Sequence, residues 1–433
     1  MDYAVALLFG SFVVLMAVGL PIAFAIGSAT AITFLLFMDF DQSMFIVAQQ
    51  MASGLDSFTL LAIPFFILAG NIMNRGGIAL RLIAFAKVLG GRLPGALAHC
   101  NVIANMMFGS ISGSAVASAA AVGGVMAPLQ KKEGYDPAFS ASVNIASCPT
   151  GLLIPPSSTL IVYSLITGGT SIAALFVAGY LPGILMGLSL MIVAGVIAKR
   201  RGYPLAPKPA LSEVLASARD AILPLGLIFI VMGGIISGAF TATEASAAAV
   251  VYTLFLALFW YREIGLRDLP AILVESAVTT SIVLLMIGAS IGMSRVMAFG
   301  GIPSTISDAL LGISDNPLIV LLAINVALLI VGTFMDMTPA LLIFTPIFLP
   351  VVTDLGMDPV HFGIIMTFNL CIGICTPPVG SALFVGCSVG GIGIGRVIRP
   401  LLPFYAVLFV LLLLVTYMPQ ISLTLPQLLL GYE

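Results

Sequence analysis

The sequence carries very little charge for its length. Of its 433 residues, 8% are Asp, Glu, Lys or Arg and 60% are hydrophobic, whereas an ordinary soluble domain has about 25% charged residues. The charges are also segregated, which leaves uncharged stretches such as Val14 to Met38 and Ala138 to Ala198. Apolar runs longer than about 18 residues are typical of transmembrane helices. The composition therefore excludes an ordinary soluble domain and predicts a multi-pass integral membrane protein.

Residues that commonly carry catalysis or bind transition metals are scarce. There are two histidines, and the five cysteines show no paired metal-binding spacing. Gly288 to Gly292 fits the G-x-S-x-G pattern, but a nucleophilic Ser290 would need a base such as histidine, and the motif lies inside a continuous apolar segment. An intramembrane serine hydrolase using Ser290 is therefore the weakest alternative. No G-K-[ST] P-loop is present, which excludes ATP hydrolysis by that route. We predict a protein that is not an enzyme, with no organic cofactor, transition metal or nucleic-acid partner.

Two proline pairs stand at matched positions in the two halves of the chain. Pro156 and Pro378 are 222 positions apart (378 − 156), and the same offset matches Asp136 with Asp358 and Gly151 with Gly373. Each pair removes two backbone donors inside an apolar run, which a lipid-exposed helix does not tolerate but a protein-lined cavity does. Breaks at corresponding positions of two halves indicate the binding site of a transporter.

The matched positions predict two repeats, whose topology the residue pattern leaves open between parallel and inverted. We place the first repeat at 1–198, with a helical hairpin near 94–129 and a broken helix near 138–166. A basic, proline-rich connector follows at 199–219, and its cations predict a cytoplasmic location. The second repeat spans 220–433, with a hairpin near 317–352 and a broken helix near 360–390. The first apolar segment, Val5 to Phe37, has no basic region before it and is predicted to be a retained helix.

Short segments rich in glycine and hydroxyl groups precede both breaks. Gly109 to Ser114 and Gly332 to Pro339 each stand about forty residues ahead of their proline pair. Glycine lets backbone carbonyls turn inward, and hydroxyls add further oxygens, which are the ligands that a hard cation such as sodium prefers. The alternative is that small residues only allow close helix packing. Because each tip is paired with a break, we favour ion or substrate binding.

Asp336 is the acid that the sequence singles out. It is the only acidic residue between Asp315 and Asp354, in a strongly apolar context, and an intramembrane carboxylate is a functional candidate. Sodium or proton coupling is its predicted role. The compatible alternative is a cap for a helix that begins near Pro339.

Two other charged residues have competing structural interpretations. Arg295 is the only cation between Arg267 and Arg396. It suits a substrate carboxylate, or it reaches the membrane interface as a snorkelling side chain. Thr241 and Glu244 have the spacing of a capping box ahead of an apolar run. We therefore interpret Glu244 as structural.

The chain resembles the large membrane subunit (DctM or SiaM type) of tripartite ATP-independent periplasmic (TRAP) transporters, within the ion transporter superfamily. The resemblance rests on motifs spread from residue 109 to 385: G-S-I-S-G-S-A-V-A, C-P-T-G-L-L-I-P-P-S, G-A-F-T-A-T-E-A, G-T-F-M-D-M-T-P-A and G-I-C-T-P-P-V-G-S. It implies an all-α fold of two inverted repeats with re-entrant hairpins and discontinuous helices that works as an elevator.

The resemblance also implies a sodium-coupled importer of an organic acid, such as a sialic acid, a C4-dicarboxylate or a sugar acid, in the bacterial inner membrane. Its partners would be membrane lipid, a separate small four-helix membrane subunit and a periplasmic substrate-binding protein. An anion transporter of the same superfamily that needs no binding protein is the alternative. Family sites lie at hairpin tips and broken helices. Sodium-binding roles are assigned to Ser110, Ser112, Gly113, Thr150, Pro155, Thr333, Asp336, Thr376 and Pro377, and substrate-binding roles to Ser114, Pro156, Ser157, Arg295, Thr338 and Pro378.

Overall fold

A computed structural model describes residues 2–90, 94–203, 211–312, 314 and 316–432. Helices and short loops account for all of these residues, and no strand occurs among them. The prediction of an all-α protein is confirmed. Residues 204–210 of the predicted connector lie outside the described part of the chain, and the repeat boundaries stay a prediction.

The helices follow one another with short connections. In chain order they are α1 (Asp2–Ala17), α2 (Ile22–Phe34), α3 (Phe40–Leu55), the 3-10 helix η1 (Phe58–Leu61), α4 (Ala62–Arg75), α5 (Ile78–Gly90), α6 (Ala96–Ser112), α7 (Ala115–Lys132), α8 (Pro137–Ser147), α9 (Thr150–Leu153), α10 (Ser158–Ile166), α11 (Ile172–Arg200), α12 (Leu211–Ile236), α13 (Ala242–Phe255), the π-helix η2 (Leu256–Trp260), α14 (Leu269–Phe299), α15 (Ile302–Leu311), α16 (Pro317–Phe334), α17 (Met337–Asp354), α18 (Pro359–Gly373), α19 (Ser381–Gly390), α20 (Ile394–Tyr417) and α21 (Gln420–Leu430).

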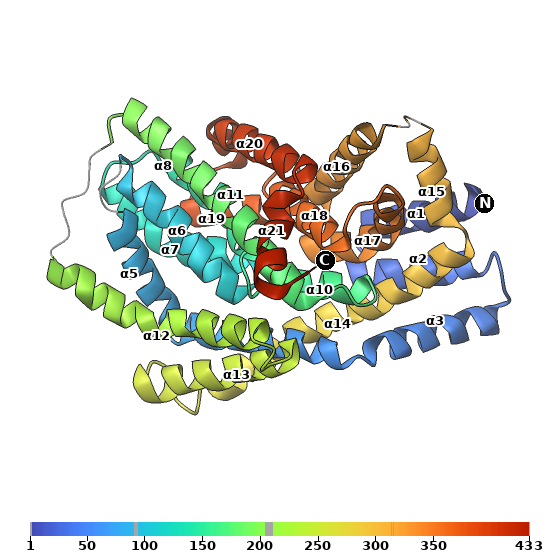
Figure 1. The fold of residues 1–433 in the computed structure, drawn as a ribbon, viewed down its shortest axis with the longest axis horizontal. Coiled ribbons are helices and arrows are strands. Elements are labelled where there is room, and N and C mark those ends of the chain that lie inside the picture. The colour runs from blue at the N-terminus through green and yellow to red at the C-terminus, as the bar shows by residue number, and fades with distance from the viewer. Residues whose placement is uncertain (1, 91–93, 204–210, 313, 315, 433) are drawn as a thin grey trace.

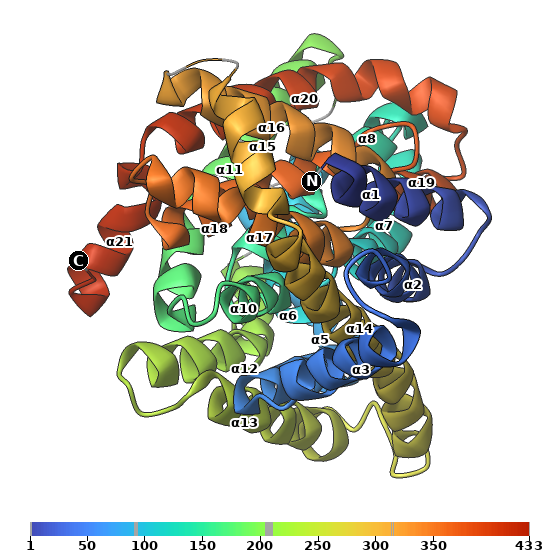
Figure 2. The same cartoon turned by 90° about the vertical axis from the view of Figure 1, so that its right-hand side faces the viewer.

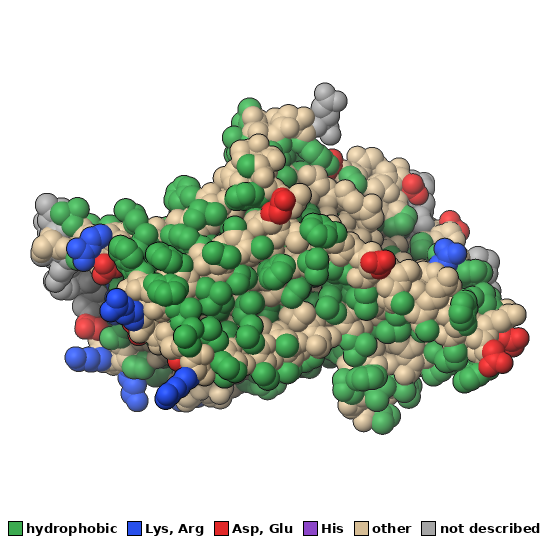
Figure 3. Space-filling model, turned by 90° about the horizontal axis from the view of Figure 1, so that it is seen from below, with side chains coloured by type: hydrophobic (Ala, Val, Ile, Leu, Met, Phe, Trp, Pro, Cys, Tyr) green, Lys and Arg blue, Asp and Glu red, His purple; other side chains and the backbone are tan. Residues whose placement is uncertain are grey.

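Many of these helices suit a lipid environment. Among the described residues, eight helices are long and apolar enough to cross a membrane, or nine if the bent pair Pro137–Leu153 and Ser158–Ile166 counts as one span. Large apolar side chains are exposed on them, for example Phe229 and Trp260, which are 76% and 62% exposed. Figure 3 shows apolar side chains over most of the face formed by α3, α12 and α13, with lysine and arginine gathered towards its left end. The chain is a multi-pass membrane protein.

The two hairpins approach the middle of the molecule from opposite ends. In Figure 1, the pair α6 and α7 extends from the left end and α16 comes from the upper right. Figure 2 shows α3, α12 and α13 along one side of the molecule and α16 and α20 along the opposite side. The hairpins therefore bring their tips together inside a frame of longer helices.

The prediction of one apolar segment from Val5 to Phe37 is wrong. The structure ends α1 at Ala17 and starts α2 at Ile22. Gly19 between them has φ = +92°, a backbone conformation that glycine adopts readily. Pro21, at the N-cap of α2, lacks the N–H that would continue a helix. Two short helices replace one long segment for this reason.

The interpretation of Glu244 as a structural residue is confirmed. Thr241 caps α13, because its hydroxyl accepts a hydrogen bond from the Glu244 backbone N–H at 3.3 Å. The Glu244 carboxylate accepts in return from the Thr241 backbone N–H at 2.8 Å. The reciprocal pair satisfies two backbone donors that the start of a helix leaves open.

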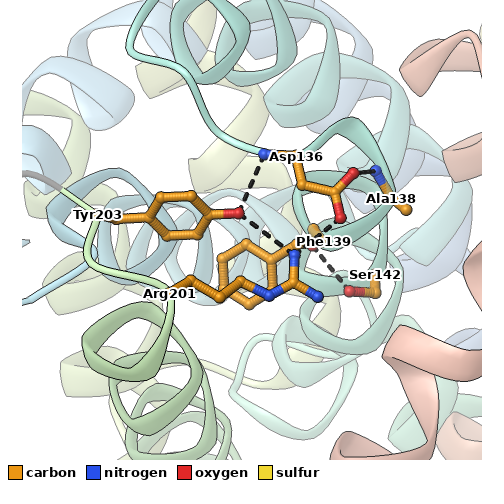
Figure 4. Close-up of polar contacts among 6 residues, drawn as sticks. All are labelled: Asp136, Ala138, Phe139, Ser142, Arg201 and Tyr203. Carbon is orange, nitrogen blue, oxygen red and sulfur yellow. Dashed lines mark hydrogen bonds and ion pairs between the residues drawn. The ribbon is translucent and has the colours of Figure 1, made fainter.

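The outer end of the first broken helix is held by a polar and aromatic cluster (Figure 4). The Asp136 carboxylate caps α8 by accepting from the Ala138 N–H at 3.0 Å, and it accepts from the Arg201 guanidinium at 2.7 Å. The Tyr203 hydroxyl accepts from the Asp136 N–H at 3.1 Å, and its ring stacks on Tyr135 with centroids 4.4 Å apart. Hydrogen bonding to Tyr203, and then to Asp136, raises the pKa of Arg201. The cluster joins the start of α8 to the end of α11.

A smaller cluster holds the matching end of the second broken helix. Asp358 caps α18 by accepting from the Val360 N–H at 2.7 Å. The Tyr432 hydroxyl donates to the same carboxylate at 3.1 Å. Burial and the neighbouring Asp358 charge raise the pKa of Tyr432 to about 12, so the phenol remains a hydrogen-bond donor at neutral pH. Each broken helix is thus anchored at its outer end by an aspartate and a tyrosine.

Candidate functional site

The tip of the first hairpin is a tight turn between α6 and α7. Gly113 ends α6 with φ = +63°, and the Ser114 hydroxyl caps α7 by accepting from the Ala117 N–H at 3.2 Å. Ser158, the first residue of α10, donates its hydroxyl to the Gly113 carbonyl at 3.3 Å. The first tip is therefore bonded to the helix that follows the first proline pair.

The tip of the second hairpin is bonded to the second break in a related way. The Thr333 carbonyl, near the end of α16, accepts from the N–H groups of Val379 and Gly380, both at 3.2 Å. Ser381, at the start of α19, donates its hydroxyl to the Asp336 carboxylate at 3.2 Å. Asp336 occupies the N-cap position of α17, but its side chain makes no capping hydrogen bond. The Asp336 side chain is exposed, and within the described part of the chain its carboxylate accepts a hydrogen bond from the Ser381 hydroxyl alone.

Glycine pairs allow each hairpin to lie directly against its broken helix. A Cβ added to Gly151 would lie 2.3 Å from the carbonyl carbon of Gly109. In the second half, a Cβ added to Gly373 would lie 2.6 Å from the Cα of Gly332. Neither distance leaves room for a side chain, so backbone packs on backbone at both places. Gly151 and Gly373 are matched by the 222-residue offset, whereas Gly109 and Gly332 are 223 positions apart (332 − 109).

Buried asparagines add a second link between hairpin and broken helix. The Asn105 amide of α6 donates to Asn144 Oδ1 on α8 at 3.1 Å, and its own oxygen accepts from the Ser118 hydroxyl of α7 at 2.7 Å. The Asn369 amide of α18 donates to Asn325 Oδ1 on α16 at 2.8 Å. Buried polar groups are costly when they lose a partner. Each hairpin is therefore joined to its broken helix by buried hydrogen bonds as well as by backbone contact.

The tips and breaks meet at a cavity of about 350 Å³. Six residues predicted from the sequence line it: Ser112, Gly113, Ser114, Pro156, Asp336 and Thr338. Three helices, α7, α10 and α17, begin at this cavity, with N-caps Ser114, Ser157 and Asp336. Helix N-termini carry unpaired N–H groups and favour anions. At α10 and α17 no side chain caps those N–H groups, so they are available to a ligand.

The other predicted residues do not line the cavity. Five hydroxyls donate to carbonyls of their own segment: Ser110 to Met107 at 2.9 Å, Thr150 to Ser147 at 2.6 Å, Ser157 to Leu152 at 2.5 Å, Thr333 to Ile330 at 2.7 Å and Thr376 to Ile372 at 2.7 Å. Pro155, Pro377 and Pro378 form the breaks and do not line the cavity. A hydroxyl that donates a hydrogen bond can still bind a cation through the lone pairs of its oxygen. The sodium and substrate roles assigned to these residues therefore stay predictions.

Arg295 lies apart from the two tips. It lines a second cavity of about 380 Å³, together with Gln50, Ser290 and Ser294. Its guanidinium lies 5.3 Å from the ring centroid of Phe299. The structure therefore does not bring Arg295 to the cavity that Asp336 lines.

Polar residues of the surrounding frame were missed by the sequence interpretation. Asn71 and Asn74 of α4 and Thr279 of α14 line the cavity opposite the tips. The Asn71 amide also donates to the Ser276 hydroxyl of α14 at 2.8 Å. Two asparagines three positions apart in an apolar helix share one face, and that spacing was the available signal.

Ser290 has no catalytic partner in the described structure. Its hydroxyl is buried and makes no hydrogen bond. The two histidines contact backbone carbonyls instead, with His99 Nε2 3.0 Å from the Pro94 oxygen and His361 Nε2 3.3 Å from the Thr416 oxygen. The serine therefore lacks the base that a nucleophile requires.

Two hairpins that meet at one cavity, each packed on a helix broken at a matched proline pair, are features of a secondary transporter. Similarity to known proteins agrees with this class. The chain belongs to the DctM component family of tripartite ATP-independent periplasmic transporters, whose family model matches residues 9–421. Its characterised relatives are transporter permeases, and the chain is not an enzyme.

Individual relatives cover nearly the whole chain. An uncharacterized protein of Salmonella typhimurium, YgiK, is 59% identical over 98% of both chains. The sialic acid TRAP transporter large permease SiaM of Vibrio cholerae is 42% identical over 96% of both chains. The C4-dicarboxylate TRAP transporter large permease DctM of Pseudomonas aeruginosa is 42% identical over 93% of this chain and 94% of its own.

A solved structure shares the fold at low sequence identity. The YdaH transporter of Alcanivorax borkumensis superposes with a TM-score of 0.65, covering 90% of this chain and 91% of its own, at 14% identity. That likeness concerns the fold alone.

Proposed function

We propose that the chain is the large membrane subunit of a sodium-coupled importer that moves an organic acid across the bacterial inner membrane. One observation carries the proposal. At the cavity, α10 and α17 begin without side-chain caps, and the Asp336 carboxylate lines the same cavity. Free N–H groups at helix N-termini suit a carboxylate ligand, and carboxylate and hydroxyl oxygens suit sodium. One cavity thus offers donors for both solutes.

Bound sodium would neutralise the negative charge that repels an anionic substrate at this site. An anionic substrate would be repelled by Asp336 in a surrounding of low polarity. The exposed carboxylate of Asp336, with the hydroxyls of Ser112, Ser114 and Thr338, provides an oxygen donor set of the kind sodium binds. A cation held there cancels the repulsion, so binding of the acid becomes favourable only with sodium. Coupling follows from that dependence.

The substrate class rests on relatives that are named for different acids. Two permeases with the same 42% identity are named for sialic acid and for C4-dicarboxylates. Their shared chemistry is a carboxylate, and the uncapped helix N-termini recognise that group. The proposed class is therefore a carboxylic acid, without a choice between the two.

Alternating access is proposed to be an elevator movement. Each hairpin is held to its broken helix by backbone contact at glycine pairs and by buried asparagine bonds. A hairpin that opened alone would break these contacts, whereas a rigid body sliding past α4 and α14 would keep them. Polar residues of those helices, including Asn71, Asn74 and Thr279, line the cavity on the other side of that sliding boundary.

Uptake into liposomes tests this function. The chain would be reconstituted with its small membrane subunit, and a periplasmic binding protein loaded with acid would be added outside. Uptake is expected only with the binding protein and an inward sodium gradient, because the acid reaches a neutralised site only with sodium. Uptake without the binding protein would favour the binding-protein-independent transporter, and uptake indifferent to the gradient would remove sodium coupling.

A further inference from the structure

A third cavity lies at the cation-rich end of the molecule, away from the tips. It measures about 440 Å³ and is enclosed by α7, α8 and the segment that joins α19 to α20. These helices lie together on the left of Figure 1, the end at which Figure 3 shows lysine and arginine gathered. Its volume is within the range of small-ligand pockets.

Two cations line this cavity, and no acid does. Lys131 lies in the last turn of α7 and Arg396 lies in the first turn of α20, and both side chains are exposed at the cavity. Neither forms an ion pair within the described part of the chain. Two unpaired cations around one pocket set up a field that attracts an anion.

A buried hydroxyl in the cavity wall lacks a partner. Ser140 of α8 is 5% exposed, and its Oγ makes no hydrogen bond to the described residues. The remaining lining residues supply apolar groups such as Pro128 and Val389. Since buried hydroxyls are normally paired, an unpaired one beside two cations is suited to a ligand oxygen.

The start of α20 lies beside this cavity, whose lining includes Ile392 and Arg396. Its N-cap is Gly393, which provides no side-chain cap for this 24-residue helix. The position matched by the 222-residue offset (393 − 171) is Ser171, whose hydroxyl caps α11 by accepting from the Ala174 N–H at 3.2 Å. At the same offset in the other half, the position of Lys131 is matched by Thr353, that of Ser140 by Phe362 and that of Arg396 by Ala174. The lining residues come from both halves, and none of the three is matched by a residue of the same kind, so the cavity is not a by-product of the repeat.

We propose that this cavity binds a phosphate group through Lys131, Arg396 and the Ser140 hydroxyl. Phosphate is the anion whose several oxygens use two cations and a hydroxyl donor together. Two sources share this chemistry: the headgroup of an anionic phospholipid, which attracts basic residues at a membrane surface, and free inorganic phosphate. The site is separate from the transport cavity and independent of sodium coupling.

Thermal stabilisation of the purified full-length chain tests the site and separates the sources. Melting temperature would be measured against phosphatidylglycerol, with phosphatidylcholine as its control, and against sodium phosphate, with sodium chloride at equal ionic strength as its control. Stabilisation by phosphatidylglycerol alone would identify a lipid headgroup, and stabilisation by phosphate would identify the free anion as a ligand. No stabilisation beyond the two controls would overturn the proposal.

Variants assign the effect to these residues. Lys131→Gln with Arg396→Gln should weaken the apparent affinity about tenfold or more, and Ser140→Ala about threefold, since each loses contacts to a charged ligand. Lys132→Gln with Arg200→Gln is the matched control, because these exposed cations belong to the same end but do not line the cavity. An equal loss in that control, or an unchanged affinity in the first pair, would contradict the assignment.

Discussion

Replacement of Gly151 or Gly373 by alanine should abolish substrate uptake. The added Cβ would lie 2.3 Å from Gly109 in the first case and 2.6 Å from Gly332 in the second. In both cases the obstructing atom is backbone, so the hairpin and the broken helix must separate. Such overpacking costs about 1–3 kcal/mol or more, and the separation displaces the tips that line the cavity. Uptake in liposomes, with melting temperature beside it, measures both effects.

The matched control for this prediction is Gly233→Ala. Gly233 lies within α12, and a Cβ added to it would meet nothing within 4 Å. Alanine is favoured over glycine in a helix by about 1 kcal/mol, so this variant should transport normally and melt no lower. Normal uptake by Gly151→Ala or Gly373→Ala would show that the glycine pairs are not required for the site.

Replacement of Asp336 by asparagine should remove most of the sodium activation of uptake. Asparagine has nearly the same shape and keeps an oxygen for the Ser381 hydroxyl, which now donates at 3.2 Å. The change therefore removes a charge while preserving the fold. Loss of a charged ligand costs about 2–3 kcal/mol, which corresponds to about 30- to 150-fold weaker sodium binding. The sodium concentration that gives half-maximal uptake is the quantity to measure.

Asp354→Asn provides the control on the same helix. Asp354 is exposed at the C-terminal end of α17 and does not line the cavity. The same loss of charge at that position should leave sodium activation unchanged. If Asp336→Asn also leaves it unchanged, Asp336 is not a sodium ligand.

Backbone chemistry explains why the sequence locates the tips. Gly113 has φ = +63°, which favours glycine at the end of α6, and the proline pairs cannot continue a helix. Such residues mark turns and breaks wherever they occur, so Ser112, Ser114 and Asp336 could be placed near a cavity without knowledge of the helix packing. The 222-residue offset between the two proline pairs also linked the two halves of the chain.

Side-chain direction could not be predicted in the same way. Ser110 and Thr150 carry the expected hydroxyls, but each donates to a carbonyl of its own segment, as helical serine and threonine often do. A residue pattern does not say whether a hydroxyl turns towards a cavity or back to the helix. The cap proposed for Asp336 illustrates the same limit, because the residue is at the N-cap position of α17 and yet makes no capping hydrogen bond.

The sequence also could not predict which helices pack beside the hairpins. Arg295 is predicted to bind the substrate because a guanidinium suits a carboxylate, but α14 carries it to a different cavity from the one that the tips line. The spacing of Asn71 and Asn74 indicates a polar face on α4, but it does not indicate that this face meets the hairpins. Contacts between elements distant in sequence depend on packing that spacing alone does not encode.

Protection of an introduced cysteine tests most directly whether the cavity between the tips is the binding site. All five native cysteines are free and buried, so a maleimide should label only a new cysteine. Asn74→Cys would place one at the cavity, and Ser237→Cys would place one at an exposed position that does not line it. Sodium together with the acid should slow labelling of Asn74→Cys and leave Ser237→Cys unchanged. Equal labelling rates of Asn74→Cys with and without both solutes would contradict a transport site at this cavity.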